Sequence, residues 1–138
     1  AFTCAGIPYL PVDIVAAEDC TVMFLNGKTL LNTCDNGCKF HHTLVRNLLG
    51  IVAQNNMYLN QKIKYTSRKT TREKLMTYLN DQAKMKGSND FTIPFNRQEL
   101  ADYLGVERSA MSAELGKLTK LGILRTQRSH FTLLKPLD

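Results

Sequence analysis

Between residues 96 and 121, apolar side chains recur at steps of three and four, which places them on one face of a helix. Two groups follow this spacing: Leu100, Tyr103 and Leu104, and then Met111, Leu115 and Leu118. Gly105 lies between the groups, and glycine readily adopts the positive φ that ends a helix. Asn96 and Glu99 have the residue types and the spacing of a capping box. The pattern therefore predicts two short helices joined by a tight turn.

The second of these helices would expose Arg108, Ser109, Ser112 and Ala113 in its N-terminal half. A recognition helix presents side chains to base edges from this position when it lies in the major groove of DNA. We therefore expect these four residues to read bases in a helix-turn-helix. The alternative interpretation is an ordinary helical hairpin that is packed in a core.

The residues that follow predict a small hairpin. Gly122 ends the second helix, residues 123–126 and 131–134 read as strands, and the polar residues 127–129 form a turn between them. A helix-turn-helix followed by a hairpin is a winged helix. Basic or polar side chains at the first helix start and in the wing are expected to bind DNA phosphates: Asn96, Arg97, Gln98, Arg125, Arg128 and His130.

Residues 39–65 predict a long helix with two adjacent apolar stripes, a face too wide for a simple two-stranded seam. One stripe is expected to pack against the same helix of a second copy. The predicted dimer interface consists of Leu44, Leu48, Ile51, Val52, Asn55 and Leu59. A monomeric core helix is the alternative. Residues 67–69 interrupt the helical pattern, and residues 64–68 are expected to be a hinge.

Other segments give coarser signals. A further helix is expected from Thr70 or Thr71 to the residue before Gly87, with a strand over residues 91–95. Residues 1–25 are rich in strand-forming side chains, which need neighbouring strands for a stable sheet. Charge is uneven: residues 1–60 hold three Lys/Arg and four Asp/Glu, whereas residues 61–138 hold fifteen and eight. A basic half that also holds a helix-turn-helix is typical of a protein that binds the phosphate backbone.

The run F-T-I-P-F-N-R-Q-E-L-A-D-Y-L-G-V-E-R-S-A-M-S-A-E-L, with the hairpin after it, resembles the C-terminal domain of Crp/Fnr-family bacterial transcription regulators. The stretch T-T-R-E-K-L-M-T-Y-L resembles the helix before that domain. The resemblance implies an α+β chain in three parts. Residues 1–38 would be the C-terminal end of a sensor β-roll, residues 39–66 the dimerisation helix, and residues 67–138 the winged helix-turn-helix domain. The chain would then be a C-terminal fragment of a longer regulator.

The resemblance also implies four partners, namely double-stranded DNA, a second copy of the chain, RNA polymerase and a small-molecule effector. It further implies that the protein acts in the cytoplasm and has no cofactor and no membrane segment. In cyclic-nucleotide-binding members an acidic residue and an Arg precede the strand that resembles residues 12–16, whereas this chain has Leu10 and Pro11 there. The effector is therefore left unnamed. Many relatives carry Glu at the position of Ser109 and Arg at the position of Ala113. The operator of this protein should therefore differ from theirs.

Four residues support a different hypothesis, a metal or redox sensor: Cys34, Cys38, His41 and His42. Their spacing is not a standard zinc pattern, so we assign no metal. Cys38 and His42 could also meet as nucleophile and base on one helix face. Nothing in the sequence orients His42, however, and no carboxylate pair or Gly-rich phosphate loop stands out, so we expect no catalytic activity.

Overall fold

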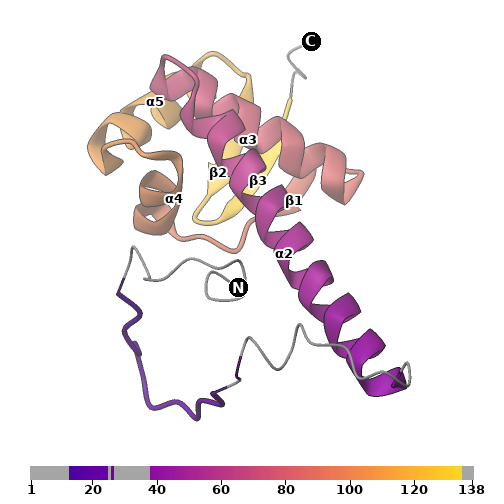
Figure 1. Cartoon of the computed structure of the whole chain (residues 1–138). Helices are drawn as coiled ribbons and strands as arrows, with labels where there is room; N and C mark the ends of the chain where they lie inside the picture. The colour runs from indigo at the N-terminus through magenta and orange to yellow at the C-terminus, as the bar shows by residue number, and fades with distance from the viewer. Residues whose placement is uncertain (1–12, 25, 27–37, 135–138) are drawn as a thin grey trace. The chain divides into compact units, whose positions relative to one another are not determined.

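The computed structural model describes residues 13–24, 26 and 38–134 (Figure 1). The chain divides into two compact units, Ala1–Met57 and Tyr58–Asp138. The boundary falls inside the long predicted helix, which is confirmed as α2 (Lys39–Thr66). The second unit begins at Tyr58, because the last turns of α2 pack with the residues that follow.

In the first unit, residues 13–24 form no strand and their side chains are exposed. The strand-like pattern of this segment is not realised because no described residue pairs with its backbone, and a strand needs such a partner. The assignments of residues 1–38 to a sensor and 39–66 to a dimerisation helix stay predictions.

The second unit contains α3 (Thr71–Lys86), β1 (Asp90–Thr92), α4 (Arg97–Leu104), α5 (Arg108–Lys120), β2 (Leu124–Gln127) and β3 (His130–Leu133). Helix α3 begins at a capping box between Thr70 and Glu73 and ends at Gly87, whose φ is 64°. The predicted helix is thereby confirmed at both ends. The predicted strand 91–95 is shorter in the structure, and Pro94 follows it with no N–H to donate to a ladder.

The three strands form one antiparallel sheet in the order β1-β3-β2. Phe91 of β1 faces Phe131 of β3 across the ladder, and their rings stack with centroids 6.3 Å apart. The turn between β2 and β3 is one residue shorter than predicted, because His130 already pairs with Gln127. The sequence did not indicate that β1 joins the hairpin as its third strand.

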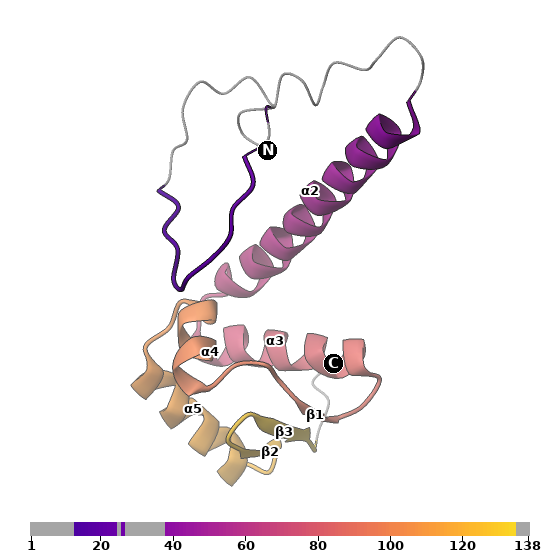
Figure 2. The same cartoon turned by 90° about the horizontal axis from the view of Figure 1, so that it is seen from below.

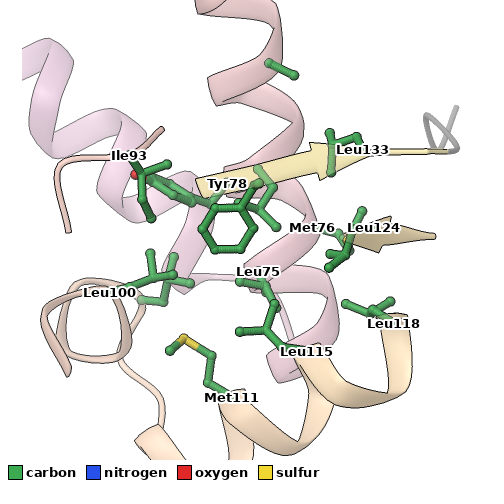
Figure 3. Packing of buried hydrophobic residues seen from close by; sticks show 14 of the residues in the cluster. Leu75, Met76, Tyr78, Ile93, Leu100, Met111, Leu115, Leu118, Leu124 and Leu133 are labelled. Carbon is green, nitrogen blue, oxygen red and sulfur yellow. The ribbon is translucent and has the colours of Figure 1, made fainter. Parts of the chain in front are cut away.

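The core of the second unit lies between the three helices and the sheet (Figure 2). Helix α5 packs against α3, α4 and β2, and α3 also packs against β1. Met111, Leu115 and Leu118 of α5 point toward Leu75 of α3 in the close-up (Figure 3). All four side chains are buried, as the apolar spacing predicted for α5.

A cluster of tyrosines extends this core onto α2. The Tyr65 side chain is 1% exposed, and its ring meets that of Tyr78 edge-on at 5.4 Å. Tyr103 of α4 contacts both rings and also Tyr58. Lys64 pairs with Asp81 of α3. The predicted hinge at residues 64–68 is therefore crossed by side-chain contacts on the α2 side.

The two buried tyrosines differ in how their hydroxyls are satisfied. Tyr65 hydrogen-bonds the Asp81 carboxylate, and this bond adds to burial in raising the pKa of Tyr65. The Tyr78 hydroxyl is buried and has no hydrogen-bond partner among the described residues.

Tyr65→Phe should lower the free energy of unfolding by about 1 kcal/mol, because a charged partner loses its donor. Tyr78→Phe should leave it unchanged or raise it, since no bond is lost. Urea unfolding of both variants compares them, and equal losses would contradict this assignment of the hydroxyls.

Candidate nucleic-acid interface

The exposed face of α5 carries the four residues predicted to read bases. Arg108, Ser109, Ser112 and Ala113 are all exposed, whereas Met111 between them is fully buried. Arg108 is the first residue of the helix, and it alone of the four has a long side chain. Any reach of more than one or two atoms beyond this face must therefore come from Arg108.

At the start of α4, three of the four backbone N–H groups of residues 96–99 are already used. The Asn96 side-chain oxygen accepts hydrogen bonds from the N–H groups of Gln98 and Glu99 at 2.9 and 3.0 Å. The Glu99 carboxylate accepts from the Asn96 N–H at 2.7 Å. The capping box predicted from sequence is thus confirmed, but it occupies the N–H groups that an anion would otherwise bind. A phosphate at this helix start would be bound mainly through side chains.

Arg97 is turned toward the wing. Its Nη2 donates a 2.6 Å hydrogen bond to Oγ1 of Thr126 on β2. Its guanidinium also lies over the Phe131 ring, 5.0 Å from the centroid. Burial lowers the pKa of Arg97 below its usual value. These internal contacts, which the sequence did not indicate, compete with the phosphate contact predicted for Arg97.

One depression on the surface brings three segments together. It is lined by residues from the start of α4, the start of α5 and the β2–β3 turn: Asn96, Arg97, Gln98, Arg108, Arg128 and Ser129. Five of these six belong to the predicted DNA-binding set, although they are up to 32 positions apart in the chain. Arg125 is exposed on β2 but does not line this depression. The fold therefore brings most of the residues predicted to contact phosphates beside the exposed face of α5 that is predicted to read bases.

A second depression lies between α5 and β2. Ser112, Gly116, Thr119, Lys120 and Thr126 are among its lining residues. Sequence reasoning missed Thr119 and Lys120, although their place on the polar side of α5 was a usable signal. A Cβ added at Gly116 would meet no other atom within 4 Å, so the surface beside α5 is open there.

His130 has contacts within the sheet that the sequence did not indicate. Its Nε2 is 2.8 Å from Oδ1 of Asp90, and its Nδ1 is 3.1 Å from Oγ1 of Thr92. Both partners belong to the neighbouring strand β1. The ring nitrogens are thus engaged within the sheet, and these contacts compete with the phosphate contact predicted for His130.

The predicted dimer residues lie on α2. Ile51, Val52 and Leu59 are 55%, 48% and 55% exposed in the single chain, and Asn55 is exposed as well. Leu44 and Leu48 are half-buried. This side of α2 therefore presents several apolar side chains to solvent in the isolated chain.

The remaining hypotheses from the sequence concern a metal or redox site, the effector and a membrane segment. Cys34, Leu10 and Pro11 lie outside the described residues. Cys38 directly precedes α2, and His41 and His42 lie in its first turn. The described part of the chain contains no group of three His, Cys, Asp or Glu side chains that could hold a metal ion. No helix in that part is long and apolar enough to cross a membrane.

Comparisons with known proteins identify the domain. The model of the Crp-like helix-turn-helix domain matches residues 73–137. A crystal structure from Eubacterium rectale, assigned provisionally to the Crp/Fnr family of transcriptional regulators, is similar with a TM-score of 0.47 and 16% identity. The similarity covers 72% of this chain and 44% of that chain. No curated protein matched. The match to the domain model identifies residues 73–137 of this chain as a Crp-like helix-turn-helix domain.

Proposed function

We propose that this chain is the DNA-binding part of a homodimeric transcription regulator of the Crp/Fnr type, which acts in the cytoplasm under control of a small-molecule effector. The observation that carries the proposal is the shared depression beside the exposed face of α5, where Arg108, Arg128 and the start of α4 converge. Basic and polar donors next to a recognition helix suit a duplex whose phosphates flank the bases being read.

The roles divide by position. Arg108, Ser109, Ser112 and Ala113 would face base edges, because they lie on the exposed side of the first turns of α5. Asn96, Gln98, Arg125 and Arg128 would bind phosphates through their side chains. Lys120 joins this second group because it lines the groove between α5 and β2.

Arg108 is expected to supply most of the base discrimination, because an arginine can form two hydrogen bonds to one guanine. Selection of binding sites from a random duplex library should first give an enriched motif for the wild-type protein. Arg108→Ala should then weaken binding to that motif by about 1–3 kcal/mol and leave binding to random duplexes nearly unchanged. Equal losses on both would assign Arg108 to a phosphate, and no enrichment would count against sequence-specific binding.

Arg128 is expected to act on every sequence alike, since it lies in the wing turn. Its φ is 53°, a conformation that asparagine also tolerates. Arg128→Asn should weaken binding to specific and random duplexes equally and lower the slope of log K against log salt by about 1. Fluorescence anisotropy over a salt series measures this slope. Gln127→Ala, a change at the exposed neighbour, is the control, and an unchanged slope in Arg128→Asn would remove Arg128 from the phosphate contacts.

The dimer is proposed to form along α2, where Ile51 and Val52 are the exposed apolar residues nearest the middle of the stripe. Ile51→Lys should convert a dimer into a monomer, because two charges would be buried together. Ala53→Lys is the matched control on the opposite side of the helix. Sedimentation equilibrium distinguishes these states. A wild-type chain that stays monomeric at high micromolar concentration would contradict the proposed interface.

The monomeric variant should also lose affinity for paired half-sites. The two recognition helices of a dimer bind half-sites about 34 Å apart, one turn of DNA. Control by an effector would act on this spacing through α2, whose last turns pack against α3 and α4. RNA polymerase is a further proposed partner.

A further inference from the structure

We propose that Arg97 is a positioning residue that fixes the wing relative to α4 and does not itself hold a DNA phosphate. The inference rests on the proposed DNA binding, because its readout is the affinity for a duplex. It reverses the role that the residue type and the place at a helix start suggest.

The contacts of Arg97 all lead into the wing. Nη2 donates to Thr126 of β2 at 2.6 Å, and the guanidinium covers the ring of Phe131 on β3. Nη1 is buried as well and has no partner among the described residues. The planar guanidinium combines a directed hydrogen bond with ring stacking, a combination that a lysine ammonium cannot reproduce. Because Nη1 is buried, it could reach a phosphate only if the guanidinium left both β-strand contacts.

Two more bonds join the same segments. Ser129 Oγ donates to the backbone oxygen of Phe95 at 2.9 Å. The Ile93 N–H donates to the backbone oxygen of Ser129 at 3.0 Å. The start of α4 and the segment before it are thus fastened to the wing on both sides of its turn, by Arg97 at Thr126 and by Ser129 at Phe95 and Ile93. Arg128 lies between these two points and is exposed. The position of the Arg128 side chain over a duplex therefore depends on both.

This arrangement predicts that Arg97 acts on DNA through Arg128. Two variants weaken the tie: Arg97→Lys keeps the charge, and Thr126→Val removes only the acceptor. Each should weaken binding to a random duplex about threefold to tenfold, and neither should weaken it further when Arg128→Asn is already present. Thr132→Val is the matched control, because it removes a threonine hydroxyl from the same sheet that bonds Asp90 instead. The control should bind DNA as the wild type does.

A direct phosphate contact gives the opposite pattern. Arg97→Lys and Thr126→Val would then bind almost normally, and Arg97→Ala would lower the salt slope by about 1 even in the Arg128→Asn background. That result overturns the proposal. Circular dichroism and thermal unfolding of every variant check that the fold is intact.

Hydrogen exchange of the Ile93 amide separates this proposal from the proposed function. The amide bonds to the wing turn, so its exchange should quicken in Arg97→Lys and Thr126→Val while amides of α3 stay unchanged. Unchanged Ile93 exchange in both variants overturns the positioning role. If the exchange changes as expected but the wild-type protein binds no duplex, only the proposed function fails.

Discussion

The structure of the second unit depends on how α5 is buried. Met111 and Leu118 of α5 have no exposed surface, and they pack into a core that includes Leu75 and Leu100, which are also fully buried. One residue of a helix turns the side chain by about 100°, so a shift in register by one position would move charged or polar groups into this core. The buried face therefore determines which residues are exposed. Arg108 and Ser112 face outward because Met111 and Leu115 cannot.

The same core makes the end of α2 part of the Crp-like domain in structural terms. Tyr65 is enclosed by Tyr78 and Tyr103, and Lys62 lies over the Tyr103 ring at 5.8 Å. Rotation about residues 64–68 would have to separate these rings, whose contacts are worth about 0.5–1.5 kcal/mol per pair beyond area burial. A movement of the last turns of α2 is therefore expected to carry α4 with it. Under the proposed control by an effector, α2 would act on the recognition helix α5 through packed side chains and not through a flexible hinge.

Local rules allowed most of this unit to be predicted from sequence. The capping box of Asn96 with Glu99 and the left-handed Gly105, at a φ of 60°, depend only on neighbours in the chain, and both lie where the spacing placed them. Helix α3 likewise begins at one of the two expected residues. The remaining features depend on partners far away in the chain. Arg97 meets Thr126 across 29 positions and His130 meets Asp90 across 40, so residue type alone suggested DNA contacts for both. The aromatic residues that join the last turns of α2 to the second unit were visible in the sequence. Their packing against one another was not.

The short side chains of α5 have a consequence for how a duplex would be read. Ser109, Ser112 and Ala113 offer at most single hydrogen bonds or methyl contacts, whereas each good bidentate pair contributes about 1–3 kcal/mol of discrimination. With Arg108 as the one long side chain, direct readout alone would give few strongly specified base pairs in each half-site. The small side chains would also let the α5 backbone approach the groove floor closely, and the wing is tied near its turn to Arg97 of α4 and to the segment before α4. A rigid reader of this kind would discriminate further through the cost of fitting the duplex to it, so sequence preference is expected at positions that no side chain touches.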